Sequence, residues 1–251
     1  MLEFKNVTFQ YEDEDFNIID NLSFKVEHGE FISLIGVSGC GKSTIFRLTN
    51  QLLAPKSGDI LVDGVSIGKQ KNYAGYMPQK DLLFPWRTIE KNLWLPMELR
   101  RLSKSDMRQK SDAILSEVGL LDYKNKYPKD LSGGMRQRIS FARTLLTDAD
   151  LMLLDEPFSA LDSLTRMSMQ EWLLAQWTHF NKTILFITHD VEEAIFLSQK
   201  IFVVTETPIR SLEVISVPAG YPRSREALKE PEIIELKEYL ISKLRKQVDS
   251  L

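Results

Sequence analysis

Residues 36–44 carry the pattern with the clearest chemistry, since they read Gly-Val-Ser-Gly-Cys-Gly-Lys-Ser-Thr and match G-x-x-x-x-G-K-[ST]. An apolar segment, Phe31–Ile35, precedes the pattern, and a segment of helical composition, Thr44–Leu53, follows it. The glycines let backbone N–H groups turn toward phosphate oxygens, and a helix that begins near Lys42 adds the positive end of its dipole. Lys42 supplies a positive charge for the β- and γ-phosphates, and the Ser43 hydroxyl is placed to bind Mg²⁺.

The strand and helix expected on either side of this loop argue against a chance match to the pattern. Cys40 contributes its backbone in this interpretation, and its thiol is a bystander rather than a nucleophile. We therefore expect the triphosphate of a nucleotide to be bound by the loop residues Gly36, Val37, Ser38, Gly39, Cys40, Gly41, Lys42, Ser43 and Thr44.

A pair of carboxylates follows the apolar run 151–154. Asp155 comes at the end of the expected strand, where ligands bind in open α/β sheets, and we expect it to hold Mg²⁺. Glu156 is expected on the opposite side of the strand's pleat, where its carboxylate can orient or deprotonate the water that attacks the γ-phosphate. The alternative for this pair is an ordinary polar strand end.

Two further polar residues are candidates for the same chemistry. His189 ends the apolar run 183–188, and we expect it at the same sheet edge as Asp155, in contact with the γ-phosphate or the attacking water. Gln79 precedes a helical region, and its amide is a candidate Mg²⁺ ligand that responds to the occupancy of the site. Taken alone, His189 reads as a structural histidine and Gln79 as a surface glutamine.

A second possible anion-binding helix terminus lies in the segment 131–138, Leu-Ser-Gly-Gly-Met-Arg-Gln-Arg. Ser132 is a favourable N-cap residue. Gly133 and Gly134 would expose backbone N–H groups at the start of the helix that follows. The alternative is a capped helix without a ligand.

The rest of the chain predicts an α/β fold with a mainly parallel core sheet. The short apolar runs 31–35, 151–154 and 183–188 suit strands that are buried on both faces, and helical stretches separate them as parallel crossovers require. The first residues alternate as half-buried strands do, and Asp63-Gly64 predicts a turn after a strand. Residues 88–118 have the composition of a helical insert. The tail 232–248 predicts an amphipathic helix with apolar residues Ile233, Leu236, Leu240, Leu244 and Val248.

Composition argues against several other classes of protein. The net charge of −3 leaves no basic footprint for nucleic acid. One cysteine and three histidines, scattered along the chain, do not make a zinc site. The first residues lack the pattern of a secretory signal, and no apolar run approaches the ~20 residues that span a bilayer. We therefore expect a cytoplasmic protein that depends on another subunit for any membrane-spanning part.

In this order, these motifs resemble the ATP-binding subunits of ABC transporters. The resemblance covers most of the chain: the phosphate loop, Gln79, the signature 131–135, Asp155-Glu156, Ser159–Asp162 and His189 follow the family's order and spacing. Tyr11 matches the aromatic residue that stacks on adenine. Position 135 departs from the pattern, because it is Met where many relatives have Gln; the backbone contacts of the two glycines should survive that.

The resemblance implies the fold of a P-loop NTPase with an antiparallel β subdomain and a helical subdomain, formed by a single domain over residues 1–251. Residues 1–86 and 136–220 would form the RecA-like core with the antiparallel β subdomain. Residues 87–135 would form the helical subdomain, and residues 221–251 a C-terminal helical tail.

The resemblance also implies a mechanism. Two copies would meet head to tail as a homodimer and enclose two ATP molecules with Mg²⁺. Each phosphate loop would face residues that the other copy contributes in trans, namely Ser132, Gly133, Gly134 and Asp162. ATP would close the dimer, and hydrolysis with product release would reopen it, because the clamp contacts exist in one state only.

Partners follow from the same resemblance. Transmembrane permease subunits would hold the chain at the cytoplasmic face of the membrane, with Phe84 and Trp86 as candidate contacts, although both side chains also suit a core. An extracellular solute-binding protein would take part indirectly, and no nucleic acid would. The stretch 83–88 and Met135 look most like importers for nitrate, sulfonates, taurine or pyrimidine vitamin precursors.

Two other functions are less consistent with the sequence. A soluble ABC-type ATPase of DNA repair or translation usually has two nucleotide domains or long coiled-coil insertions, which this chain lacks. An inactive nucleotide-binding scaffold is disfavoured by the joint presence of Lys42, Glu156 and His189.

Overall fold

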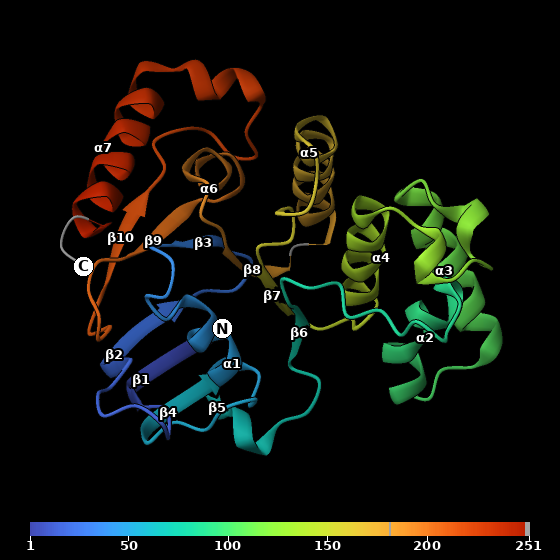
Figure 1. The fold of residues 1–251 in the computed structure, drawn as a ribbon, viewed down its shortest axis with the longest axis horizontal. Coiled ribbons are helices and arrows are strands. Elements are labelled where there is room, and N and C mark those ends of the chain that lie inside the picture. Colours follow the sequence, from blue (N-terminus) through green and yellow to red (C-terminus); the bar gives the residue numbers. More distant parts are fainter. Residues whose placement is uncertain (181, 249–251) are drawn as a thin grey trace. The chain divides into compact units, whose positions relative to one another are not determined.

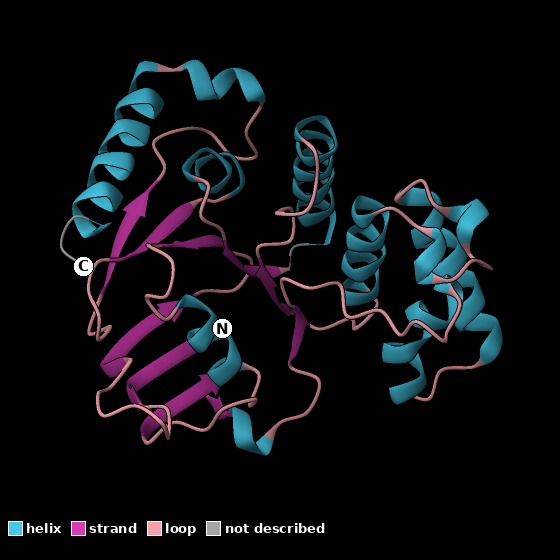
Figure 2. Cartoon of the chain, in the orientation of Figure 1, coloured by secondary structure: helices cyan, strands magenta, loops and turns pink. Residues whose placement is uncertain are grey.

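The computed structural model describes residues 1–180 and 182–248, and its contacts divide the chain into two compact units (Figures 1 and 2). The first unit holds residues 1–73 and the segment from Trp172 onward, and the second holds residues 74–171. Helix α5 (Ser163–Phe180) contains one boundary between them.

The first unit contains two sheets with their helices. Its elements are β1 (Leu2–Phe9), β2 (Ile19–Val26), β3 (Phe31–Ile35), α1 (Lys42–Thr49), β4 (Ser57–Val62), β5 (Val65–Ser66), η1 (Ile67–Lys69), β8 (Thr183–Ile187), α6 (Val191–Leu197), β9 (Lys200–Val204), β10 (Leu212–Ser216), η4 (Arg225–Lys229) and α7 (Pro231–Val248).

The second unit is mainly helical. Its elements are β6 (Ala74–Met77), α2 (Ile89–Leu99), α3 (Lys104–Glu117), η2 (Leu121–Tyr123), η3 (Pro128–Asp130), α4 (Gly133–Leu145) and β7 (Leu151–Asp155).

The antiparallel sheet of the first unit has the order β2-β1-β4-β5. The expected Asp-Gly turn joins β4 to β5, and Asp63 and Gly64 have positive φ angles of 52° and 75°. Two successive left-handed residues suit a tight hairpin, because their twist matches that of the flanking strands. The antiparallel β subdomain predicted from the sequence is therefore confirmed.

The core strands of the first unit are mainly parallel. Strand β3 lies between β8 and β9 and is parallel to both, with Leu34 opposite Ile187 on one side and Phe202 on the other. Strand β10 closes the set as an antiparallel neighbour of β9. Every residue of β3 and β8 is buried, as expected for continuous apolar runs in a sheet covered on both faces.

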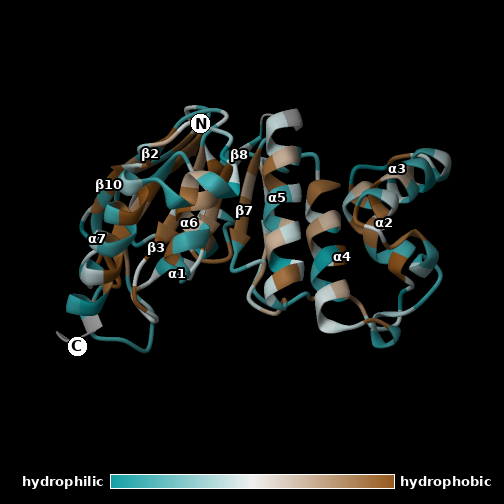
Figure 3. Cartoon of the chain, turned by 90° about the horizontal axis from the view of Figure 1, so that it is seen from above, coloured by the Kyte–Doolittle hydropathy of each residue, from teal (hydrophilic) through white to brown (hydrophobic). Residues whose placement is uncertain are grey.

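The second unit combines a parallel strand pair with the predicted helical insert. Strands β6 and β7 are parallel, with Met77 opposite Leu154, and the apolar residues of β7 are brown in Figure 3. Thr88 caps α2 by accepting a hydrogen bond from the Lys91 N–H at 3.4 Å. Helices α2, α3 and α4 then pack on one another.

The tail forms the predicted amphipathic helix, α7, which lies beside β10 in Figure 1. Ile233 and Leu240 are buried in one cluster with residues of α6 and β9. Leu236 and Leu244 pack against this cluster while partly exposed, and the side chain of Val248 lies outside the described part. Among the described helices, none combines the length and the apolar character that crossing a bilayer requires.

Candidate nucleotide-binding site

The phosphate loop connects β3 to α1 within the first unit. Gly41 has a φ angle of 102° and is the N-cap of α1, which begins at Lys42 as predicted. Gly36 is needed for a different reason: a Cβ there would lie 2.9 Å from Cys40 Sγ and 3.0 Å from Val204 Cβ. The first N–H groups of α1 have no acceptor within the helix, so this turn offers donors to an anion.

Lys42 lies folded over its own loop. Its Nζ donates hydrogen bonds to the carbonyl oxygens of Gly36 and Val37, both at 2.8 Å. The side chain is 8% exposed, so the ammonium is held in place at the loop. An anchored cation beside helix N–H groups fits the triphosphate of a nucleotide.

Cys40 is buried, and its Sγ lies 3.8 Å from Lys42 Nζ. Burial raises the pKa of this thiol, although the nearby ammonium acts in the opposite direction. A protonated thiol is a poor nucleophile. This agrees with the expectation that Cys40 contributes its backbone to the loop.

Tyr11 is attached to the helix that follows the phosphate loop. Its hydroxyl lies 3.0 Å from Thr44 Oγ1 and accepts a hydrogen bond from the Arg47 guanidinium at 3.4 Å. Phe9 meets the tyrosine ring edge-on, with ring centroids 4.8 Å apart. The residue expected to stack on adenine is thus tied directly to α1.

His189 follows β8, and the phosphate loop follows β3. These strands are parallel neighbours, so His189 and Gly36 emerge at the same edge of the sheet. The side chain of His189 is exposed. The first unit therefore brings together the loop, Tyr11 and His189.

The second unit holds the remaining predicted residues. Gln79 and Asp155 lie at the carboxyl ends of the parallel strands β6 and β7. Gln79 Nε2 donates to Glu156 Oε2 at 3.0 Å, and Asp155 is 7% exposed. In the described residues no cluster of three or more His, Cys, Asp or Glu could hold a metal ion. Mg²⁺ is often bound by one or two carboxylates together with substrate phosphates.

The backbone at Glu156 differs from the expectation. Strand β7 ends at Asp155, and Glu156 has a φ angle of 47°, in the left-handed region. A turn rather than the pleat of the strand therefore directs its side chain. Left-handed residues other than glycine cost free energy and cluster at functional sites.

Ser132 is the N-cap of α4, as predicted, and its Oγ accepts a hydrogen bond from the Met135 N–H at 3.3 Å. A Cβ at Gly134 would lie 3.1 Å from Leu161 Cδ2, so the start of α4 packs beside the segment that carries Asp162. Asp162 accepts a hydrogen bond from the Thr165 N–H at 3.0 Å. Hydrogen bonding by Thr165 lowers the pKa of Asp162 and keeps it ionised.

Two arginines of α4 have contacts near Gln79 that the sequence did not predict. Arg136 Nε lies 2.9 Å from Asp81 Oδ2. Arg143 donates to the carbonyl oxygens of Asp81 and Leu82 at 2.8 and 2.9 Å. The loop after Gln79 is thereby tied to the helix that Ser132 caps. In the sequence they are arginines that recur along α4, a pattern that is equally typical of a solvent-exposed helix face.

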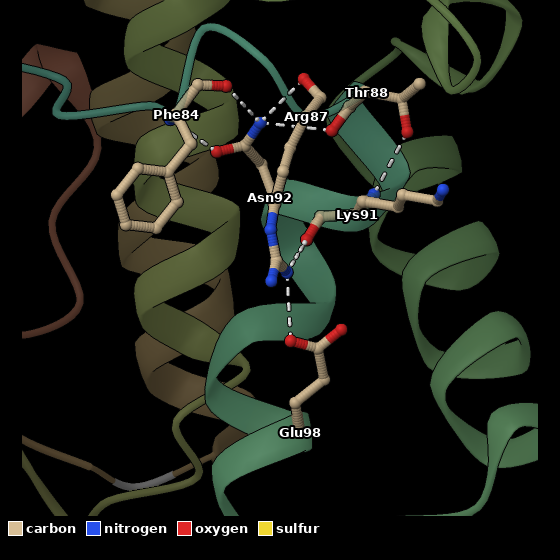
Figure 4. Close-up of polar contacts among 6 residues, drawn as sticks. All are labelled: Phe84, Arg87, Thr88, Lys91, Asn92 and Glu98. Atoms are coloured by element: carbon tan, nitrogen blue, oxygen red, sulfur yellow. Dashed lines mark hydrogen bonds and ion pairs between the residues drawn. The ribbon is translucent and has the colours of Figure 1, made fainter.

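Asn92 was also missed, and Figure 4 shows it beneath the loop of residues 84–88. It is 0% exposed, and its Oδ1 accepts a hydrogen bond from the Phe84 N–H at 2.8 Å. Its Nδ2 lies within hydrogen-bond distance of three carbonyl oxygens, those of Phe84, Arg87 and Thr88. This amide fixes the backbone that presents the exposed side chains of Phe84 and Trp86.

The same loop borders a pocket of about 610 Å³ in the second unit. Its wall is largely apolar, with Phe84, Leu95, Pro96 and Leu99. Trp86 is 72% exposed and stacks on Phe84, with ring centroids 5.1 Å apart. This exposure excludes the core alternative for Trp86.

Comparison with known proteins decides the family. The sequence profile described as "ABC transporter" matches residues 19–159, which is more than half of the chain. The chain belongs to the ABC transporter family. Within this family, its sequence is 40% identical over 232 residues to the formylaminopyrimidine import ATP-binding protein ThiZ of Halalkalibacterium halodurans, covering 92% of this chain and 90% of the relative.

Two more members of the ABC transporter family support this placement. The aliphatic sulfonates import ATP-binding protein SsuB of Bacillus cereus is 38% identical over 86% of this chain and 85% of its own length. The ATP-binding cassette MJ0796, solved as a dimer in a post-hydrolysis state bound to ADP and Pi, has 26% identity and a TM-score of 0.77, covering 88% of this chain and 100% of that one. The ABC transporter chain is thus an ATP-binding and ATP-hydrolysing subunit, with the P-loop NTPase fold predicted from its motifs.

Proposed function

We propose that this ABC ATPase works as a head-to-tail homodimer that binds two ATP molecules with Mg²⁺ and energises an importer. The proposal rests on the two helices that begin at glycine-rich turns, α1 after the phosphate loop and α4 after Ser132, because the free N–H groups of a helix start can bind an anion. The first would bind the nucleotide of its own copy, and the second would bind the nucleotide of the other copy.

Each predicted residue has a role in this proposal. In the loop, Lys42 neutralises charge on the β- and γ-phosphates, and Thr44 with the amides of residues 36–43 completes the cradle. Tyr11 stacks on adenine. Mg²⁺ would be held by Ser43, Asp155 and Gln79, and it would neutralise charge that develops on the phosphates.

The chemical step is assigned to two residues. Glu156 orients the attacking water or takes its proton. Gln79 donates a hydrogen bond to the Glu156 carboxylate and would thereby help to position it. His189 contacts the γ-phosphate or that water. Four residues act in trans on the nucleotide of the other copy: Ser132, Gly133, Gly134 and Asp162. The capped start of α4 supports this role for the first three.

The transported solute is inferred from relatives. ThiZ and SsuB are named for import of a formylaminopyrimidine and of aliphatic sulfonates, so we propose a small anionic solute or a vitamin precursor. Permease subunits would bind the pocket beside Phe84 and Trp86 and would hold the chain at the cytoplasmic face of the membrane. A solute-binding protein would deliver the solute on the other side.

We also propose the division of the single domain that the motifs suggest. Residues 1–86 and 136–220 would form the nucleotide-binding core with its antiparallel β subdomain. Residues 87–135 would act as the helical subdomain, and residues 221–251 as the tail.

The variant Glu156→Gln tests the proposed function. The amide keeps the shape of the side chain and loses the base, so ATP should bind but persist, and the closed dimer should accumulate. Light scattering with ATP and Mg²⁺ should give twice the mass measured without nucleotide, whereas the variant Glu117→Gln, at an exposed position of α3, should behave as the wild type. A monomeric Glu156→Gln variant at saturating ATP would contradict the proposal.

A further inference from the structure

Helix α6 follows His189 directly and is short. It has 7 residues, Val191–Leu197, and isolated helices below ~12–15 residues are marginal in water. Its last carbonyl groups also need partners from outside the helix. The conformation at His189 therefore depends on whatever holds α6.

The C-terminal end of α6 is held by two side chains from the tail. Arg223 donates through one terminal nitrogen to the carbonyl oxygen of Ile195, at 3.2 Å, and to that of Ser198. The Tyr221 hydroxyl donates to the carbonyl oxygen of Leu197 at 2.6 Å. Three carbonyl groups at the end of the helix thus obtain donors from a segment that lies more than twenty residues further along the chain.

Arg223 is well suited to this position. It is 6% exposed, and its guanidinium also lies over the Tyr221 ring, 5.1 Å from the centroid. A cation at the C-terminal end of a helix interacts favourably with the helix dipole. Burial of Arg223 costs desolvation free energy, and the carbonyl groups of α6 offset part of that cost.

The N-terminal end of α6 is fixed as well. Asp190 Oδ1 accepts hydrogen bonds from the N–H groups of Glu192 and Glu193, at 2.9 and 3.1 Å. The Thr188 hydroxyl donates to the Glu193 carboxylate and accepts from the Asp190 N–H, so both neighbours of His189 are attached to α6.

The tail reaches this end of α6 too. Lys237 of α7 lies 2.6 Å from a carboxylate oxygen of Glu192. Between the two ends, Val191 and Ile195 of α6 share a buried cluster with Ile233 and Leu240 of α7. The tail therefore contacts α6 at both ends and between them.

We propose that Arg223 is a positioning residue for His189, because it fixes the far end of the short helix whose first turn sets the histidine backbone. The proposal rests on the role assigned to His189 in hydrolysis. If α6 shifts or frays, His189 moves relative to the phosphate loop, which emerges from the neighbouring strand. Arg223 itself donates to the carbonyl groups of Ile195, Ser198, Val217 and Ala219 and to none of the phosphate loop, so its loss should affect nucleotide binding less than the position of His189.

Steady-state ATPase kinetics of the full chain test this. The variant Arg223→Met keeps the apolar stem and removes the donors. We expect kcat to fall between about tenfold and a hundredfold, the range that misplacement of a reacting group produces, while KM for ATP stays within about twofold. The variant Arg223→Lys, which keeps a cation and donors, should recover most of kcat.

A matched control is Lys243→Met, which removes a tail cation whose partners are Glu213 of β10 and Tyr239 of α7 rather than residues of α6. Its kcat should equal that of the wild type. If Arg223→Met folds poorly, Tyr221→Phe removes one hydroxyl from the Leu197 carbonyl and should lower kcat to a smaller extent, with faster hydrogen exchange in residues 190–198 and unchanged exchange in β3.

The outcomes separate the two claims. An equal loss of kcat in Lys243→Met, a parallel loss of ATP affinity in Arg223→Met, or unchanged kcat in both Arg223→Met and Tyr221→Phe would overturn the positioning role. If His189→Ala keeps wild-type kcat, the role of His189 fails instead, and any loss in Arg223→Met then has another cause.

Discussion

Replacement of Asn92 by leucine should destabilise the chain by about 1–4 kcal/mol, because it removes the partners of buried backbone groups. Leucine has the same number and branching of side-chain heavy atoms as asparagine, so it leaves no cavity. The Phe84 N–H, now bonded at 2.8 Å, would lose its acceptor in a site where Asn92 is 0% exposed. The Phe84 and Arg87 carbonyl groups would each lose a donor.

Two of these carbonyl groups keep another donor: that of Thr88 also accepts from the backbone N–H of Asn92 at 2.9 Å, and that of Phe84 from the backbone N–H of Arg87 at 3.1 Å. The variant therefore leaves one buried N–H group, that of Phe84, and one carbonyl group, that of Arg87, to be counted, at about 1–3 kcal/mol for a fully buried unsatisfied group and less for a group near the surface. The melting temperature should fall by roughly 2–16 °C, since a chain of this size loses about 2–4 °C per kcal/mol.

Urea unfolding followed by tryptophan fluorescence measures this change. The matched control is Asn125→Leu, at an exposed turn position, which should change the free energy of unfolding by less than about 0.5 kcal/mol. Trypsin should also cleave after Arg87 faster in Asn92→Leu, because the loop of residues 84–88 loses its anchor. A loss below about 0.5 kcal/mol with wild-type cleavage would refute this account of the loop.

Two further variants test single residues. Lys42→Ala removes the cation that is anchored at the phosphate loop, so the Kd for ATP should rise about 10–100-fold in calorimetric titration, and an unchanged Kd would remove Lys42 from the site. Trp86→Ala should leave the free energy of unfolding within about 0.5 kcal/mol, because the ring is 72% exposed, yet it should weaken binding to the permease at least tenfold in a pull-down series. If the variant and the wild type bind the permease equally well, Trp86 is not part of the permease contact.

Features that depend on neighbouring residues in the chain were predictable from the sequence. Strand β3 was expected at residues 31–35 and lies there, because its apolar run and the glycine after it are contiguous. The start of α1 and the Ser132 cap were predictable for the same reason: a cap and the amides that it accepts from lie within one turn. Parallel packing followed from runs that are apolar on both faces.

The contacts that were missed join distant parts of the chain. Arg143 donates to a carbonyl group 62 residues earlier, and Arg223 donates to one 28 residues earlier. A single sequence does not show which residues so far apart in the chain meet in the fold. The backbone turn at Glu156 was missed for another reason: a left-handed conformation at a glutamate is costly, so local preferences argue against it. Such costly conformations are expected where function rather than stability selects the residue.

The most direct test of the shared nucleotide site is an experimental structure of Glu156→Gln with ATP and Mg²⁺. The account predicts two copies related by a twofold axis, with Ser132 and the two glycines of one copy in contact with the γ-phosphate that lies on Lys42 of the other. A nucleotide whose γ-phosphate faces solvent, with no second copy opposite, would contradict it.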